Sequence, residues 1–220
     1  MSTFLSSVKK CPLFAHIEEP NLQPLLDCLG PMQRTYSKSE FIFMAGARVK
    51  YVGVVLSGSV NVVQEDYWGN RAILAHVETG DLFGEAFSCV ETDSLPIGAL
   101  ATEDSELLLL DYKRIINTCP TACKFHTALI HDMVKILAQK NIMLTQKMEI
   151  VTRRTTRERL MAYLSLQAIR AGESRFVIPF DRQQLADYLS VERSAMSTEL
   201  SKMQADGLIW TQRSEFELLD

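Results

Sequence analysis

The residues from 192 to 205 have the types and spacing that a DNA-reading helix needs. Met196, Leu200 and Met203 recur at intervals of four and three, so one face of this helix is apolar. The opposite face is small, polar and basic, and it carries Arg193, Ser194, Ser197, Thr198 and Ser201. Small side chains let a helix enter a major groove about 12 Å wide, where an arginine can donate two hydrogen bonds to guanine. The pattern predicts a recognition helix whose first exposed residues read base edges.

A shorter helix precedes this one. Asp181 can cap a helix over Arg182–Leu189, which would bury Leu185, Ala186 and Leu189. Arg182 and Gln183 stand at its start, where side chains and helix N–H groups bind phosphate. We expect both to contact the DNA backbone.

A hairpin follows the recognition helix. Its expected strands are Leu208–Gln212 and Glu215–Leu219, with Arg213 and Ser214 at the tip, and a short strand over Phe176–Phe180 precedes the helix pair. Two helices and a hairpin in this order make a winged helix-turn-helix.

A long helix is expected between Pro120 and about Thr152, where no glycine or proline interrupts the chain. Apolar residues recur there in a heptad pattern whose a and d positions are Ile130, Val134, Leu137, Asn141, Leu144, Met148 and Val151. About 30 residues span roughly 45 Å, more than a small domain needs, so we expect the seam to pair with a second copy. Asn141 would fix the register. The alternative is a helix packed on its own domain. A second helix is expected from Thr155 to Ala171, ended by Gly172.

The segment from Phe41 to Asp111 consists of short apolar runs separated by glycines. The expected strands are Phe41–Phe43, Tyr51–Leu56, Val60–Val63, Ala72–Val77 and Leu107–Leu110. Gly69-Asn70 suits a hairpin turn because both residues tolerate a positive φ. A helical stretch is expected only near Glu85–Val90. The fold class is therefore α+β, with an antiparallel β-sandwich or barrel before the helices.

Composition supports a folded chain with an uneven charge. The 220 residues are 47% hydrophobic and carry a net charge of −4. Residues 1–120 hold 15 acidic and 9 basic side chains, and residues 121–220 hold 12 and 14, so the later part is the better polyanion binder. Four arginines fall within seven residues, at Arg153, Arg154, Arg157 and Arg159, a pattern that also fits a solvated helix face. No transmembrane run or secretory signal is recognised, so we expect a cytoplasmic protein.

The side chains that do chemistry in enzymes form no recognisable set. The five cysteines include no Cys-x-x-Cys pair, and no Cys and His spacing suits zinc. No Ser/His/Asp set, no carboxylate pair in an apolar stretch and no phosphate loop occurs. We predict neither catalysis nor a metal site.

Taken in order, these segments resemble the cyclic-AMP receptor and fumarate-nitrate regulator (Crp/Fnr) superfamily of bacterial transcription regulators over nearly the whole chain. The most specific stretches are Val55–Val60, Gly80–Glu85, Val191–Ser197 and Gly207–Ile209. The resemblance implies an effector-sensing β-roll like a cyclic-nucleotide-binding jelly roll (1–119), a dimerisation helix (120–152) and a winged helix (153–220). It also implies a homodimer, an activator that works with RNA polymerase on double-stranded promoter DNA, with half-sites about 34 Å apart.

The sequence departs from the cyclic-AMP-binding members of this family. Those members follow the Gly-Glu pair by an Arg-Ser pair that holds the cyclic phosphate, and the aligned positions here are Leu95-Pro96. Burying a phosphate without a cation costs several kcal/mol, so we expect no cyclic AMP. By alignment, the effector pocket consists of Gly84, Glu85, Leu95, Pro96, Leu144 and Thr145. Glu85 has a second interpretation, as a structural carboxylate.

The effector stays open. Only Cys11 and Cys28 lie early in the chain, too few for the four thiolates of an iron–sulfur cluster. His76 or Cys89 could hold haem, and Cys119 with Cys123 could sense oxidants. An uncharged or aromatic small molecule, or a diatomic gas bound through haem, fits better than a nucleotide.

The family's DNA-reading Arg, Glu and Arg align with Arg193, Ser194 and Thr198, which implies a different operator. A sensor that acts through protein contacts instead of DNA is the alternative function.

Overall fold

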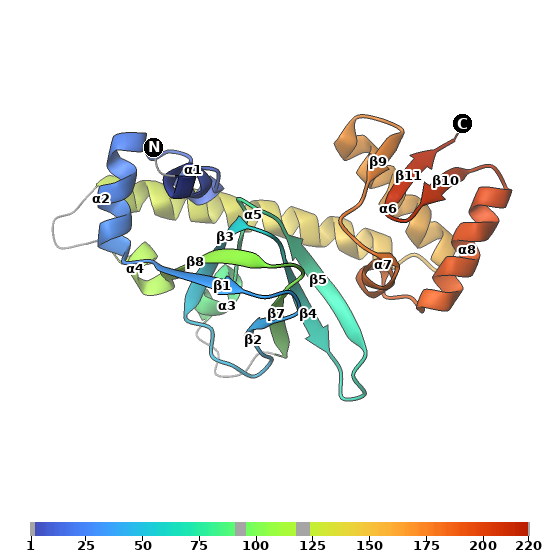
Figure 1. Ribbon diagram of the computed structural model, residues 1–220, viewed down its shortest axis with the longest axis horizontal. Helices are drawn as coiled ribbons and strands as arrows, with labels where there is room; N and C mark the ends of the chain where they lie inside the picture. Colours follow the sequence, from blue (N-terminus) through green and yellow to red (C-terminus); the bar gives the residue numbers. More distant parts are fainter. Residues whose placement is uncertain (1–2, 91–95, 118–123, 220) are drawn as a thin grey trace. The chain divides into compact units, whose positions relative to one another are not determined.

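Two antiparallel four-stranded sheets form the centre of the first of two units in this computed structural model (Figure 1). The units span Met1–Lys140 and Asn141–Asp220, and the structure describes residues 3–90, 96–117 and 124–219. One sheet has the order β1-β8-β3-β6 and the other β2-β7-β4-β5. The strands are β1 (Met32–Tyr36), β2 (Phe41–Phe43), β3 (Tyr51–Ser57), β4 (Val60–Glu65), β5 (Arg71–Val77), β6 (Leu82–Phe83), β7 (Ile97–Ala101) and β8 (Ser105–Asp111).

The central strands β3 and β8 are buried on both faces. Val55 and Leu107 pack in the apolar core between the two sheets, whereas Val54 and Leu108 pack in a second core with helices. Side chains of a strand alternate between faces, so two covered faces produce a continuous apolar run. This explains why the sequence shows these two strands so clearly.

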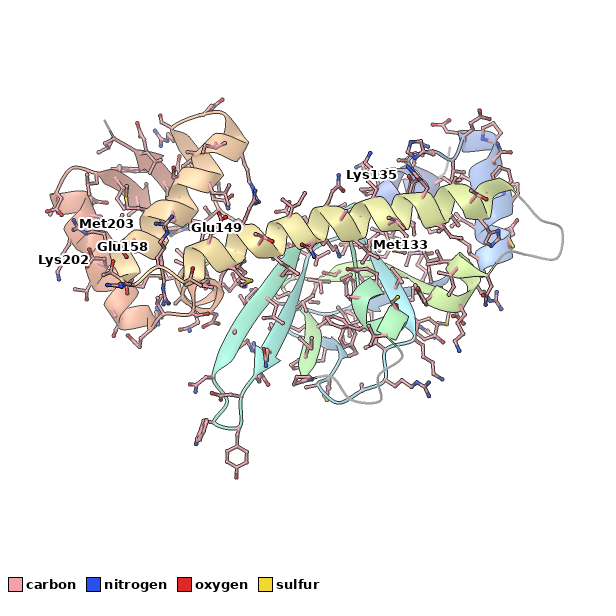
Figure 2. All side chains as sticks on the ribbon, turned by 180° about the vertical axis from the view of Figure 1, so that it is seen from behind. Met133, Lys135, Glu149, Glu158, Lys202 and Met203 are labelled. Atoms are coloured by element: carbon pink, nitrogen blue, oxygen red, sulfur yellow. The ribbon has the colours of Figure 1, made fainter. Side chains whose placement is uncertain are left out.

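Helices cover the outer face of the first sheet. They are α1 (Thr3–Lys9), η1 (Pro12–Phe14), α2 (Glu19–Leu29), α4 (Tyr112–Ile116) and α5 (Lys124–Val151). Helix α3 (Glu85–Val90) follows β6, and its Phe87 packs against the core between the sheets. Leu129, Met133 and Ile136 of α5 are buried in the core shared with α1 and α2. Met133 is 4% exposed, and Lys135 on the same helix is exposed (Figure 2).

The second unit is a three-stranded sheet with helices. Its elements after α5 are α6 (Thr156–Ala171), β9 (Arg175–Val177), α7 (Arg182–Leu189), α8 (Arg193–Ala205), β10 (Ile209–Gln212) and β11 (Glu215–Leu218), with the sheet order β10-β11-β9. Tyr163, Leu164 and Phe216 fill its core. Thr155 caps α6 in a capping box with Glu158.

The structure confirms the α+β fold class and all five strands expected in the first unit, and it corrects two local predictions. The β4–β5 loop is longer than a two-residue turn: Asp66 N donates to Asn70 O and Asn70 N to Asp66 Oδ1, and of Gly69 and Asn70 only Gly69 has a positive φ, 82°. The strand expected over Phe176–Phe180 ends at Val177. Among the helices of the described residues, none combines the length and the hydropathy of a membrane span.

Candidate nucleic-acid interface and effector region

Helix α8 presents a small polar face to solvent. The Glu192 side chain caps the helix by accepting a hydrogen bond from the Ala195 N–H at 2.9 Å. Met196, Leu200 and Met203 are at most 3% exposed and fix the orientation of the helix. The predicted base-reading residues are all exposed on the other side: Arg193, Ser194, Ser197 and Thr198.

The hydroxyl groups on this face are bonded within the helix. Ser194 Oγ donates to the Glu192 carboxylate, and Thr198 Oγ1 donates to Ser194 O at 3.0 Å. The hydrogen bond from Ser194 lowers the pKa of Glu192. Because these hydroxyl groups bond to their own helix, their side chains do not project far from it. This allows the helix to approach a groove closely.

The turn before α8 is held from both sides. Asp181 caps α7 in a capping box with Gln184, and Ser190 ends α7 in the left-handed conformation at φ 54°. Arg159 Nη1 donates to Leu189 O at 3.2 Å and to Ser190 O at 2.8 Å. The helix pair is therefore tied to α6 at its turn.

The arginine cluster at the start of α6 acts inside the unit. Arg157 Nε and Nη2 pair with Glu199 Oε1 and Asp206 Oδ2, each at 2.5 Å, and the bond to Glu199 is the main cause that raises the pKa of Arg157. Arg159 binds the turn as described. These two arginines position α8, so neither is a free phosphate contact in this structure.

Of the two residues predicted to contact phosphate, Arg182 points into the unit and Gln183 is exposed. The Arg182 guanidinium points into the unit: Nη2 donates to Thr211 Oγ1 at 2.9 Å, and the group lies over the Phe216 ring, 5.1 Å from its centre. Burial lowers the pKa of Arg182. This placement favours a structural role over the predicted phosphate contact. Gln183 is exposed and donates to Asp187 Oδ1 at 2.8 Å, so it remains accessible.

A shallow hollow of about 370 Å³ lies beside this face. It is lined by Thr155, Thr156, Arg157, Ser194, Ala195, Thr198, Glu199 and Lys202. Lys202 is exposed there (Figure 2), a cation that the sequence analysis did not name. The exposed tip of the hairpin adds Arg213, whose φ is 53°.

In the first unit, the Gly84-Glu85 pair forms the turn between β6 and α3. Gly84 has a φ of 83°, and a Cβ atom on it would lie 3.0 Å from Tyr51 O. Glu85 is 5% exposed, and its Oε1 accepts a hydrogen bond from Lys140 Nζ at 2.9 Å. Lys140 Nζ also donates to Leu82 O at 2.6 Å.

Lys140 is a residue of the effector region that the sequence analysis missed. It supplies a cation from α5 to a turn that lies 55 residues earlier, and only the tertiary fold shows this. Glu85 Oε2 has no hydrogen-bond partner among the described residues. The carboxylate therefore keeps one buried acceptor that no described group satisfies.

The other expected effector residues are only partly described. Leu95 lies outside the described residues, and Pro96 is exposed. On α5, Leu144 is 54% exposed, and exposed Thr145 donates from Oγ1 to Asn141 O at 3.0 Å.

The haem and redox candidates lie in separate environments. His76 Nδ1 shares a hydrogen bond with the side chain of buried Asn61 at 2.7 Å, and burial lowers the pKa of His76. Cys89 Sγ accepts a hydrogen bond from Tyr112 at 3.0 Å. Cys11 is buried, which raises its thiol pKa to about 12, whereas Cys28 is exposed. Cys119 and Cys123 lie outside the described residues.

The expected dimer seam contains large apolar side chains in solvent. Val134 is 61% exposed, Leu144 54% and Met148 63%, and Asn141 is exposed too. Ile130, Leu137 and Val151 are half-buried. A single helix that exposes this much apolar surface is typical of an interaction face.

Models of two protein families match the chain. Residues 33–121 match the family described as the cyclic nucleotide-binding domain, and residues 158–220 match the Crp-like helix-turn-helix domain. The first match covers the strands of the first unit, and the second covers α7, α8 and the hairpin.

Similar proteins have the same organisation. The chain is 25% identical to the CRP-like protein Clp of Xanthomonas oryzae over 191 residues, 80% of this chain and 79% of that one. It is 25% identical to the cyclic AMP receptor protein of Thermus thermophilus over 205 residues, 92% of this chain and 89% of that one. The solved structure of the c-di-GMP responsive global regulator CLP of Xanthomonas campestris superimposes with a TM-score of 0.75 at 19% identity, covering 90% of this chain and 99% of that one.

Proposed function

Since the chain belongs to the Crp/Fnr superfamily of bacterial transcription regulators, we propose that it works as a homodimeric activator that responds to an effector other than cyclic AMP. It is a Crp-like transcription regulator with a DNA-binding helix-turn-helix and a cyclic nucleotide-binding domain. In the proposal, residues 1–119 sense the effector, 120–152 form the dimer helix and 153–220 bind promoter DNA in the cytoplasm, next to RNA polymerase.

The observation that carries DNA reading is the exposed face of α8. Arg193 is exposed at the first turn of a firmly capped and packed helix, beside small side chains that allow close approach. An arginine at this place can pair with guanine O6 and N7. Replacing it should cost about 1–3 kcal/mol and relax the preference at one base pair in each half-site.

The test is binding to a duplex enriched from a random library by the wild-type protein. Arg193→Ala should weaken binding to that duplex and lose the preference at one position, while Arg34→Ala, an exposed arginine on β1, should change neither. A uniform loss over all sequences would show that Arg193 contacts only phosphate. Failure to enrich any duplex at low salt would favour a sensor that acts through protein contacts.

The apolar seam of α5 supports the homodimer. The proposed pairing covers Val134, Leu144 and Met148, and exposed Asn141 would meet its counterpart at an a position. Val134→Glu leaves the core of the chain intact because Val134 is outside it. Sedimentation should show a dimer for the wild type and for Gln139→Glu, an exposed off-seam control, and a monomer for Val134→Glu. A dimeric Val134→Glu variant would contradict this pairing.

The Glu85–Lys140 pair supports an effector other than cyclic AMP. Lys140 already neutralises the carboxylate, so the pair offers a cyclic phosphate no net positive charge. With Leu95-Pro96 at the positions of the phosphate-binding pair, we propose an uncharged or aromatic ligand near Gly84 and Glu85. Cyclic di-GMP is a necessary comparison, because the CLP regulator of Xanthomonas campestris is c-di-GMP responsive.

Calorimetry with cyclic AMP, cyclic GMP and cyclic di-GMP tests the proposal that the effector is not a cyclic nucleotide. Binding of any of them at micromolar concentration would contradict it. Mass spectrometry and an absorption spectrum of protein purified without air test the ligand itself. A Soret band would assign haem in place of an organic molecule.

A further inference from the structure

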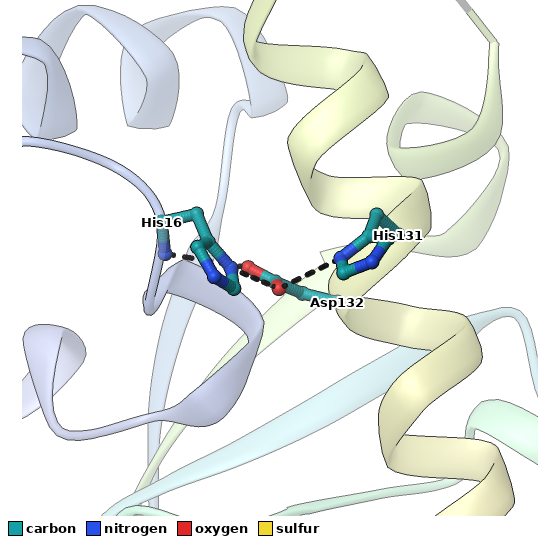
Figure 3. A group of neighbouring side chains, drawn as sticks. All are labelled: His16, His131 and Asp132. Carbon is teal, nitrogen blue, oxygen red and sulfur yellow. Dashed lines mark hydrogen bonds and ion pairs between the residues drawn. The ribbon is translucent and has the colours of Figure 1, made fainter.

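A cluster of two histidines and one aspartate lies apart from the proposed DNA and effector sites. His16 is in the turn between η1 and α2, and His131 and Asp132 are neighbours on α5 (Figure 3). His16 Nδ1 lies 2.5 Å from Asp132 Oδ1, and His131 Nδ1 lies 3.6 Å from the same oxygen. The two imidazole rings meet edge to face with their centres 5.7 Å apart. The fold thus brings three nitrogen and oxygen ligands together from segments over a hundred residues apart.

In this cluster the carboxylate is buried and the two imidazoles are exposed. The Asp132 side chain is 1% exposed, whereas those of His16 and His131 are 55% and 70% exposed. A buried carboxylate is costly unless positive charge or hydrogen bonds compensate it. Asp132 accepts a weak bond from the His16 N–H at 3.4 Å in addition to the imidazole contact. The remaining side of the carboxylate faces two imidazoles that water can reach.

The turn that carries His16 is held in place. Lys9 Nζ donates to Phe14 O at 3.1 Å and to Ala15 O at 3.3 Å, and it also binds Ile17 O. On the other side, α5 is anchored by buried Leu129 and Met133. Both parts of the cluster therefore rest on packed elements, which a metal site requires in order to keep its geometry.

The donor set matches a divalent transition metal. Zinc binds imidazole nitrogen and carboxylate oxygen at about 2.0–2.1 Å, so tetrahedral ligand atoms lie about 3.3 Å apart. All three candidate ligand atoms lie within 4.8 Å of one another, and metal binding would require the side chains to rotate to that spacing. Zinc would take the place of the proton between His16 and Asp132, and water would complete its coordination on the open side.

We propose that His16, His131 and Asp132 bind one Zn²⁺ ion per chain and tie the turn before α2 to α5. The sequence analysis did not predict this site, because His16 lies more than a hundred residues before the adjacent pair His131 and Asp132, and an adjacent His-Asp pair alone is no metal motif. His131 adjoins Ile130, a seam residue, so the ion would brace the helix beside the proposed dimer face.

The test uses the full-length protein without a histidine tag, stripped with a chelator and then desalted. Zinc titrated in competition with a chromophoric chelator should bind at one equivalent per chain. Cobalt should give visible d–d absorption bands without the near-ultraviolet charge-transfer band of thiolate ligands, which separates this site from the five cysteines.

His131→Gln is the decisive variant because His131 is exposed and its loss leaves the core intact. It should weaken zinc binding at least tenfold and abolish the cobalt spectrum, while Lys135→Gln, one turn further along α5, should bind like the wild type. Zinc should raise the melting temperature of the wild type and not that of His131→Gln. Equal affinity in His131→Gln, thiolate bands or no binding at 100 µM zinc would each overturn the proposal and leave a His16–Asp132 ion pair only.

Discussion

Replacing Lys140 by methionine should loosen the turn between β6 and α3. The Glu85 side chain is 6% exposed, and Lys140 Nζ is the described donor to its Oε1. Removing one partner of a buried ion pair costs about 3–5 kcal/mol, because the other charge stays buried. The Lys140 side chain is itself 31% exposed, so water can replace part of what it provides. We therefore expect a local loss of about 2–3 kcal/mol.

Hydrogen exchange measures this loss locally, without assuming that two units unfold together. The Ser88 N–H donates to Gly84 O at 2.9 Å, so its exchange reports opening of the first turn of α3. A loss of 2–3 kcal/mol corresponds to exchange about 30- to 150-fold faster in peptides that cover Leu82–Val90. Lys135→Met, on the exposed side of α5, the helix that carries Lys140, should exchange like the wild type.

The double variant Glu85→Gln with Lys140→Met separates the ion pair from the loss of a side chain. With no charge left to bury, its exchange should return to within about tenfold of the wild type. If Lys140→Met left the exchange unchanged, or if the double variant exchanged as fast as Lys140→Met, the ion pair would not hold this turn.

Three further predictions concern single positions. Glu192→Ala should lower the midpoint of a urea titration because it removes the side chain that caps α8, while Glu192→Asn, which keeps a capping oxygen, should lower it less; equal midpoints in the two variants would show that the cap contributes little. Gly84→Ala should lower the melting temperature, because φ is 83° and the new Cβ would lie 3.0 Å from Tyr51 O; an unchanged value would show that the turn can relax. Burial lowers the pKa of Lys147 from 10.5 to about 8, so the unfolded chain binds more protons between these values and stability should rise with pH there. Denaturation midpoints at about pH 8 and 9.5 should show that rise in the wild type and not in Lys147→Met, and an equal rise in both would assign it to other groups.

Segments with a regular apolar pattern could be predicted from the sequence. The caps of α6 and α7 are Thr155 and Asp181, and the inner face of α8 repeats every three or four residues, so these helices follow from local chemistry. Strands β3 and β8 were clear because both of their faces are covered.

Elements without such a pattern were missed for physical reasons. Strand β1 is an edge strand with three exposed residues in its centre, so little in Met32–Tyr36 marks it as a strand. Strand β7 contains glycine and alanines, which have low strand propensity and pair only because β4 and β2 lie on either side.

The candidate sites also differ in whether a local pattern predicts them. The exposed residues of α8 belong to one helix, so their common face follows from their spacing. The partners of Arg182, Glu85 and Asp132 come from distant segments, and no local pattern predicts such contacts. For Arg182 the neighbouring hairpin decided the orientation of the side chain: Thr211 and Phe216 hold a guanidinium that local position alone would direct to phosphate.

The Glu85–Lys140 contact also offers a physical route from effector to DNA within the proposed function. Lys140 directly precedes Asn141, a residue of the seam, so its ammonium joins the β6–α3 turn to the helix that we expect to pair. Glu85 Oε2 is the buried acceptor left without a described partner, and a ligand that donates to it satisfies that oxygen without removing Lys140. A ligand that takes Oε1 instead competes with Lys140, whose ammonium would then keep only its bond to Leu82 O. Only a ligand that takes Oε1 changes the contacts of α5. Such a ligand shifts the equilibrium between the forms with and without the Glu85–Lys140 bond only by the difference in its affinity for these two forms. Within the proposed function, the chemical group that a ligand presents to Glu85 should therefore decide whether binding changes the contacts of α5 or leaves them as they are.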